Sequence, residues 1–132
     1  MQSQFPVSLK AIMWKGDSVL FLKNPRQEWE LPGGRPELGE SEQQTVVREV
    51  QEECGFDVTH PRYEATRQCE VIPNGFVEIR FFTCDYAEPA VRLSEEHIHA
   101  EWILIRGPRP PDVPDFYWTT CANLLRQRKS KA

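Results

Sequence analysis

The sequence lacks several features that would identify a class of protein at once. It holds no apolar run long enough to span a membrane, and its first residues, MQSQFPVSLK, contain no apolar stretch typical of a signal peptide. Its four cysteines stand apart from one another, without the close spacing of a zinc site or a redox motif. We therefore expect a cytoplasmic protein with reduced cysteines and no membrane partner.

An excess of positive charge is also missing. The chain has 16 lysines and arginines against 20 aspartates and glutamates, and a net charge of −4 is not the electrostatic footprint of a nucleic-acid-binding protein. We expect no nucleic-acid partner, and an anionic ligand would have to be met by a metal ion or by local basic side chains. The chain has 132 residues, 39% of them hydrophobic, and no internal repeat, so we expect one domain over residues 1–132.

Strand-like and helix-like segments follow one another in a mixed order. Segments rich in β-branched and aromatic residues, or alternating between apolar and polar residues, predict strands at 5–14, 18–23, 63–72, 76–85 and 101–105. Turns are expected at 15–17 and 73–75, and a proline-rich loop leads to a final helix. This order indicates an α/β fold in which helices cover a mixed sheet.

The clearest helix of the chain follows the glycine pair at 33–34. Ser41 and Gln44 fit a capping box with Ser41 as the N-cap, and Gly55 stands where a helix would end in a left-handed residue. Four apolar residues between these ends fall on one arc and are expected to pack on a sheet: Val46, Val47, Val50 and Cys54.

Three glutamates of this helix stand at spacings that bring their side chains to one patch. Glu49, Glu52 and Glu53 lie at i, i+3 and i+4, and converging carboxylates repel one another unless a cation neutralises them. Oxygen ligands without cysteine or histidine favour Mg²⁺, with Mn²⁺ as a substitute, over zinc. Arg48, four residues before Glu52, can hold that carboxylate by paired hydrogen bonds. Considered alone, three such glutamates more often form a solvated acidic face, so the surrounding residues decide between the two interpretations.

The surrounding residues form a longer pattern. Gly34 is followed after five residues by Glu40, and Glu40 after seven residues by the run REVQEECGF at 48–56. This pattern resembles the full signature of the Nudix hydrolases at every specified position, including both apolar ones, Val50 and Phe56. The signature covers 23 of the 132 residues, and the flanking WELPG at 29–33 extends the resemblance more loosely.

The resemblance, to small MutT-like or ADP-ribose-pyrophosphatase-like Nudix proteins, implies an α/β/α sandwich with a mixed sheet. It also implies Mg²⁺-dependent hydrolysis of a diphosphate linkage in a nucleoside diphosphate joined to another group, by attack of water on phosphorus. Nucleoside triphosphates, ADP-ribose-like sugars and dinucleoside polyphosphates stay open as substrates, and so does a homodimer. The alternative is a non-catalytic module that binds a nucleotide or metabolite, which would not need to keep Arg48 and the three glutamates together.

The resemblance also implies roles for individual residues. The implied metal ligands are the carbonyl of Gly34 and the carboxylates of Glu49, Glu52, Glu53 and Glu96. The implied catalytic residues are Arg48, Glu49, Glu52 and Glu96. Glu96 comes from SEEH at 94–97, which looks like the family's later loop segment, and it would act as an extra ligand or as the general base. Glu95 and then Glu101 are the alternatives to it, and Glu40 is either an outer acid of the site or a structural partner.

The chemistry of a nucleotide indicates which residue types would bind the substrate. Phosphates favour lysine or arginine, and a nucleobase favours an aromatic or aliphatic face. Five residues are candidates from their positions in the chain: Lys23, Arg26, Trp29, Glu30 and Arg80. Trp29 is either a core or cleft-wall residue or a stacking platform, and the loop histidines His97 and His99 are weaker candidates for substrate contact.

Overall fold

The computed structural model describes residues 5–87 and 96–130, so the alternative site residue Glu95 lies outside the described residues. Two helices and two four-stranded sheets make up the described part of the chain. In chain order the elements are β1 (Val7–Ile12), β2 (Trp14–Lys15), β3 (Ser18–Lys23), β4 (Trp29–Glu30), β5 (Gly33–Gly34), α1 (Glu42–Cys54), β6 (Asp57–Ile72), β7 (Gly75–Ala87), β8 (His99–Leu104) and α2 (Asp115–Ser130).

One sheet is mixed and the other is antiparallel. The mixed sheet has the order β5-β1-β7-β6, in which β1 runs parallel to β7 and the other two pairs are antiparallel. In the second sheet β3 pairs antiparallel with β2, β4 and β8. The predicted strand 5–14 is divided, because β1 ends at Ile12 and β2 begins at Trp14 in the other sheet. The first strand segment therefore links the two sheets.

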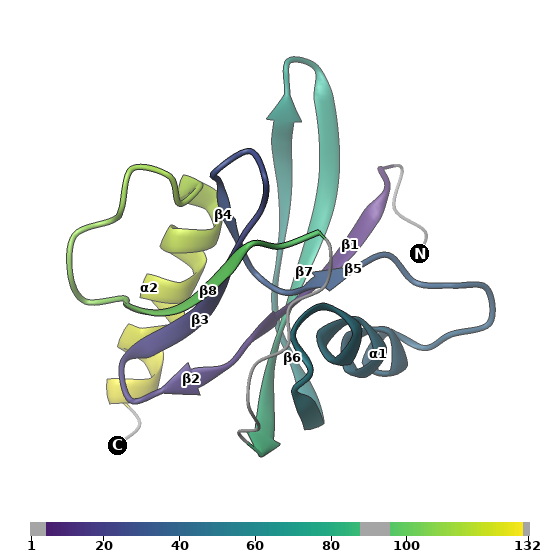
Figure 1. The fold of residues 1–132 in the computed structure, drawn as a ribbon, viewed down its shortest axis with the longest axis horizontal. Helices are drawn as coiled ribbons and strands as arrows, with labels where there is room; N and C mark the ends of the chain where they lie inside the picture. The colour runs from purple at the N-terminus through teal and green to yellow at the C-terminus, as the bar shows by residue number, and fades with distance from the viewer. Residues whose placement is uncertain (1–4, 88–95, 131–132) are drawn as a thin grey trace.

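The central strands are buried on both faces, so alternate residues enter two separate apolar clusters. Val19 and Phe21 of β3 belong to the cluster that includes α2, whereas Leu20 and Leu22 belong to the cluster that includes α1. β1 and β7 alternate in the same way, and this period of two fixes the register of each strand. The two helices lie on opposite sides of the strands (Figure 1), which confirms the predicted α/β/α sandwich with its mixed sheet.

Helix α1 begins and ends as its sequence predicts. Ser41 Oγ accepts a hydrogen bond from the Gln44 N–H, and the Gln44 side chain accepts one from the Ser41 N–H, which completes the capping box. Gly55 ends the helix in the left-handed region, with a φ of 79°. Because these signals lie within the helix itself, they fix its ends without help from the rest of the fold.

The buried stripe of α1 differs from the predicted apolar arc at one residue. Val46 and Val50 are buried, but Val47 is 38% exposed, so the prediction for Val47 is wrong. Val47 lies at the edge of the arc, and the stripe turns instead toward Thr45 and Glu53, both of which are buried. An acidic side chain of α1 therefore faces the interior.

The hairpin of β6 and β7 projects beyond the rest of the molecule (Figure 1). It turns at Pro73 and Asn74, and the φ of Asn74 is 61°, so the predicted turn at 73–75 is confirmed. Its strands are longer than the predicted segments and reach back to Asp57 and forward to Ala87. Neither helix in the described part of the chain is long and apolar enough to cross a membrane.

Gly33 lies directly against β1, and its substitution tests this packing. A Cβ built on Gly33 would lie 1.9 Å from the carbonyl oxygen of Leu9, and the φ of Gly33 is +150°. We expect Gly33→Ala to lower the free energy of unfolding by about 3 kcal/mol or more, because the methyl group would push β5 away from β1. Urea unfolding followed by circular dichroism measures the change. Gly107→Ala is the matched control, since its Cβ would meet nothing closer than 3.5 Å. Equal stability of the two variants would contradict the close approach.

Candidate active site

The last turn of α1 places Glu53 inside the molecule. Its side chain is 7% exposed, and one carboxylate oxygen accepts a hydrogen bond of 2.6 Å from the backbone N–H of Gly33. This hydrogen bond links α1 to β5. It holds the carboxylate beside the glycine pair at 33–34.

Glu49, one turn earlier, occupies the space beside Gly34. A Cβ built on Gly34 would lie 2.5 Å from both the carboxylate carbon and Oε2 of Glu49. A side chain at residue 34 would therefore displace the carboxylate, and glycine allows it to approach the backbone. The structure thus brings together two of the predicted metal ligands, Gly34 and Glu49.

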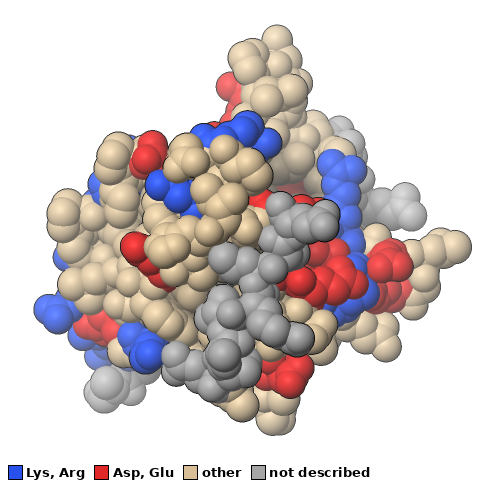
Figure 2. Space-filling model, viewed as in Figure 1, with Lys and Arg blue, Asp and Glu red and all other residues tan. Residues whose placement is uncertain are grey.

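Arg48 binds the acidic side chains on the outer face of α1. Its guanidinium makes a forked pair with Glu40, from Nε to Oε2 at 2.8 Å and from Nη2 to Oε1 at 3.0 Å. It also donates to Glu49 from Nη1 at 2.7 Å, and the contact of the same nitrogen with Glu52 is longer, at 3.3–3.5 Å. Arg48 therefore contacts both carboxylate oxygens of Glu52, as predicted, but through one nitrogen and at longer distances than its contacts with Glu40, which the loop before α1 brings to the forked side of the guanidinium. In Figure 2 acidic side chains gather over α1 with basic side chains among them. These contacts favour the structural role for Glu40.

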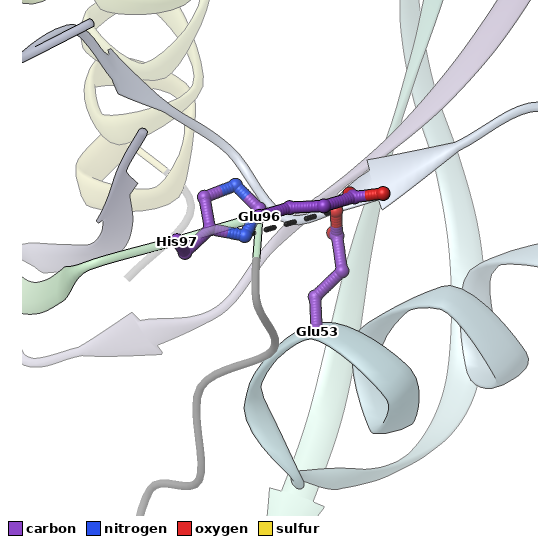
Figure 3. A group of neighbouring side chains, drawn as sticks. All are labelled: Glu53, Glu96 and His97. Carbon is purple, nitrogen blue, oxygen red and sulfur yellow. Dashed lines mark ion pairs between the residues drawn. The ribbon is translucent and has the colours of Figure 1, made fainter. Parts of the chain in front are cut away.

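Glu53 belongs to a second group, with Glu96 and His97. One potential ligand atom of each residue lies within 4.8 Å of the others. Figure 3 shows the three side chains converging from α1 and from the segment that precedes β8. Nδ1 of His97 lies 4.0 Å from Oε2 of Glu53 and has no hydrogen-bond partner among the described residues, although the side chain of His97 is only 1% exposed. The predicted loop carboxylate therefore lies beside a predicted helix carboxylate.

A buried cation lies near this group. Lys10 of β1 donates a hydrogen bond of 3.1 Å from Nζ to the carbonyl oxygen of Leu31. Burial works to lower the pKa of Lys10, but Tyr117 and three neighbouring glutamates, Glu30, Glu53 and Glu49, together outweigh it and raise the pKa. Burial raises the pKa of Glu53 to about 7, although the charge of Lys10 works against this rise. A further cation beside Glu53 would therefore favour its ionised form.

Glu30 lies between His97 and a cavity that forms the second part of the site. Its Oε2 lies 3.2 Å from Nε2 of His97, and its Oε1 accepts a hydrogen bond of 2.8 Å from Nδ2 of Asn24. Burial works to raise the pKa of Glu30, but the hydrogen bond from His97 and the charge of Lys10 outweigh it and lower the pKa to about 2. Glu30 is therefore an ionised acceptor, so Nε2 of His97 carries the proton of that contact.

A cavity of about 300 Å³ has Glu30 in its wall. Its lining comes from the loop before β4, from β4 itself, from the end of β6 and from the start of α2: Asn24, Arg26, Glu28, Trp29, Glu30, Glu70, Val71, Pro114, Phe116 and Tyr117. Three of the five predicted substrate-binding residues, Arg26, Trp29 and Glu30, come together here. Trp29 is 7% exposed and so forms a wall of the cavity and part of the core, not a free platform.

The other two predicted substrate-binding residues lie outside the lining of this cavity. Lys23 places Nζ 5.0 Å from the ring centroid of Trp29. Arg80, on the mixed sheet, is paired with Glu42 and with Glu78. The contacts of Arg80 indicate a structural link between β7 and the start of α1.

The remaining candidates, His99 and Glu101 of β8, lie at the surface. His99 Nε2 lies 3.0 Å from Oε1 of Glu101, and both side chains are 54% exposed. Among the described residues, Glu96 offers a ligand atom close to one of Glu53, whereas Glu101 does not belong to that group. Glu96 is therefore better placed than Glu101 to take part in the site.

A larger cavity, of about 430 Å³, lies between β2, the β6–β7 hairpin and the end of α2. Trp14, Arg62, Asp85 and Arg128 are among the described residues that line it, and none of its described lining residues is a predicted site residue. Volume alone therefore does not identify the active site.

The residues present fit a divalent cation. The carboxylate of Glu49 reaches the backbone at Gly34, and Glu53 and Glu96 offer two further oxygen ligands in one group. Carboxylate and carbonyl oxygens are the ligands that Mg²⁺ and Mn²⁺ take in proteins. The unpaired Nδ1 of His97 lies at the same group.

Comparison with known proteins identifies the family of this chain. The family model described as the NUDIX domain matches residues 5–122, which is most of the chain. The chain belongs to the Nudix hydrolase family. The helix that carries the three glutamates is therefore the Nudix helix of the family signature.

Individual relatives and a solved structure are similar to this chain in sequence or in fold. An 8-oxo-dGTP diphosphatase of Escherichia coli (strain K12) is 31% identical over 97 residues, which cover 74% of each protein. A CTP pyrophosphohydrolase of the same organism is 38% identical over 66 residues, which cover 46% of this chain and 49% of that protein. For several curated relatives the chain spans about half of their length or less. The crystal structure of a MutT protein from Methanosarcina mazei Go1 has a TM-score of 0.82 at 25% identity, over 98% of this chain and 99% of that one.

The spacing of residues in the sequence did not predict several residues of the site. Lys10 carried a signal, since a lysine within a strand of mostly apolar residues indicates a buried charge with a partner. Asn24 and Phe116 carried no such signal. They reach the cavity only because the loop before β4 packs beside the start of α2.

The ionisation of Glu40 should report on the contact with Arg48. The hydrogen bond from Arg48, followed by the one from the Glu37 N–H, lowers the pKa of Glu40 to about 2. A lowered carboxyl pKa stabilises the fold above the ordinary value, and this contribution is lost as the pH falls through about 2. We expect the ¹³C carboxyl signal of Glu40 to titrate near pH 2, and to return toward its ordinary range in Arg48→Ala. Arg26→Ala, which removes an exposed ion pair with Glu28, should leave this titration unchanged. An ordinary titration of Glu40 in the unaltered protein would refute the forked pair.

Proposed function

We propose that this chain hydrolyses a diphosphate linkage in a nucleoside diphosphate joined to another group, with Mg²⁺ as the cofactor and Mn²⁺ as a substitute. The observation that carries the proposal is the approach of Glu96, from a loop, to Glu53 of the Nudix helix, within a chain whose NUDIX match spans residues 5–122. The contact of Glu49 with Gly34 supports it, because it adds ligands for a cation beside the same glycine pair.

Each group of the site has a proposed task in attack by water on phosphorus. Glu49, Glu52, Glu53 and the carbonyl of Gly34 would hold the cation. A divalent cation bound there neutralises charge on the phosphate oxygens and lowers the pKa of water. Arg48 keeps Glu49 in place, and Glu96 accepts the proton of the attacking water.

For the substrate we infer a nucleoside triphosphate, cleaved to a mononucleotide and pyrophosphate. The two Escherichia coli relatives carry names of enzymes that act on such molecules, CTP and 8-oxo-dGTP. The cavity of about 300 Å³ offers the aromatic walls of Trp29, Phe116 and Tyr117 for a base. Glu30 lies in that wall and contacts His97. The base would therefore lie on the Glu30 side of this pair, and the phosphates on the His97 side.

Hydrolysis should depend on a divalent cation. A panel of nucleoside triphosphates, ADP-ribose and a dinucleoside polyphosphate would be incubated with excess Mg²⁺, and phosphate, pyrophosphate and mononucleotide would be measured separately. We expect pyrophosphate and mononucleotide from at least one triphosphate, and none after EDTA treatment. Mg²⁺ should also raise the melting temperature, since binding at 100 times Kd stabilises a folded protein by about 2.7 kcal/mol. Undiminished activity after exhaustive EDTA treatment would refute the metal-dependent reaction.

Kinetic measurements can distinguish Glu96 as the general base from Glu96 as a metal ligand. If Glu96 is the general base, Glu96→Gln should lower kcat by about 10²–10⁴-fold with little change in KM or in the Mg²⁺ concentration needed for half of full activity. Glu101→Gln is the matched control and should retain most activity, because Glu101 is a surface residue paired with His99. Recovery of Glu96→Gln at high Mg²⁺ would instead identify Glu96 as a metal ligand. Full activity of Glu96→Gln would exclude both roles.

A further inference from the structure

His97 is buried, yet one of its ring nitrogens is left without a partner. Its side chain is 1% exposed, and Nδ1 forms no hydrogen bond with any described residue. A buried polar atom without a partner costs about 1–3 kcal/mol, so natural proteins seldom keep one without a use for it. Nδ1 points toward the carboxylate of Glu53 at 4.0 Å, a distance too long for a hydrogen bond (Figure 3).

The other ring nitrogen is held in the way that suits a metal ligand. Nε2 contacts the ionised carboxylate of Glu30 at 3.2 Å, and a second hydrogen bond from Asn24 fixes that carboxylate. A histidine that binds a metal usually donates its other N–H to a carboxylate, which orients the ring and selects the tautomer with a free lone pair. When the ring is neutral with its proton on Nε2, the lone pair is on Nδ1, on the side of Glu53.

The spacing of the three side chains agrees with ligands of a single ion. Opposite ligands at about 2.1 Å from an ion lie about 4.2 Å apart. Nδ1 of His97 and Oε2 of Glu53 are 4.0 Å apart, and the group with Glu96 extends to no more than 4.8 Å. Small movements of these side chains would therefore suffice to bind a cation between them.

We propose that His97 is a nitrogen ligand of this metal site, beside Glu53, and that the site therefore binds a first-row transition ion such as Mn²⁺ or Co²⁺ more tightly than Mg²⁺. Imidazole is a borderline ligand that Mg²⁺ rarely accepts, whereas affinity for nitrogen ligands rises from Mn²⁺ toward Cu²⁺. This proposal corrects the expectation that the site offers oxygen ligands alone. It rests on the proposed function for the presence of a cation at the Nudix helix, but it can be tested without substrate.

The direct test is pulsed electron paramagnetic resonance of Mn²⁺ bound to the unaltered protein. Electron spin echo modulation from ¹⁴N is expected in the unaltered protein and should disappear in His97→Gln. Glutamine can keep the contact of Nε2 with Glu30 while it removes the nitrogen lone pair at the position of Nδ1. His99→Gln is the matched control, because His99 is exposed and contacts Glu101, and it should retain the ¹⁴N signal.

The affinities give a second measurement. In a titration with Mn²⁺, the resonance signal measures the free ion, and His97→Gln should bind Mn²⁺ at least about tenfold more weakly than the unaltered protein. Competition between Mg²⁺ and Mn²⁺ should show a much smaller change in the affinity for Mg²⁺. Bound Mn²⁺ without ¹⁴N modulation in the unaltered protein would overturn the proposal, and this measurement needs no variant to fold. Equal losses for Mn²⁺ and Mg²⁺ would also overturn it, since they would indicate a structural role for His97. A ¹⁴N signal in a protein that hydrolyses none of the substrates in the panel would support the ligand while refuting the proposed function.

Discussion

The hydrogen bond from the Gly33 N–H to the Glu53 carboxylate joins α1 to the mixed sheet, and the rest of the site takes its position from this contact. It forms because β5 lies directly against β1 at Leu9, which only a residue without a side chain allows. It also requires the buried stripe of α1 to include Glu53. With both elements fixed, Glu49 reaches Gly34 on one side, and Glu53 faces His97 on the other. A displacement of either element would separate these groups.

The two faces of α1 balance negative charge in different ways. On the outer face the cation belongs to the protein, since Arg48 contacts Glu40 and Glu49. On the inner face burial raises the pKa of Glu53 from its ordinary value near 4.5 to about 7, which corresponds to about 3 kcal/mol against the ionised form. The stability that the protonated form provides is complete below the ordinary pKa and is lost as the pH rises through about 7. Lys10 and the Gly33 N–H offset only part of this cost, so the inner face is the one on which a bound cation would stabilise the fold most.

Local signals in the sequence were enough to predict α1 and its glutamates. The capping box at Ser41 and the end at Gly55 depend on neighbours within a few residues, and the spacing of the carboxylates follows from the helix itself. The mixed sheet could also be predicted, from the order of the segments. The contact of Arg48 with Glu52 followed from their spacing on the helix, but its shorter contact with Glu40 could not be predicted, because it depends on the path of the loop before α1. The same holds for the cavity and for the nitrogen of His97, which meet Glu30 only when β4, β8 and the start of α2 are assembled.

Most of the cavity wall can change in sequence without any change in the proposed metal ligands. Most of the lining comes from a loop, the end of a projecting hairpin and the first turn of α2, none of which carries a proposed metal ligand. Substitutions there can change the shape of the cavity while the carboxylates keep their positions, so selection can alter ligand preference without rebuilding the chemistry. Glu30 is the exception, because the same carboxylate borders the cavity and holds the ring of His97. A lineage that replaces Glu30 changes both properties in one mutational step, and this residue therefore limits how independently they can evolve.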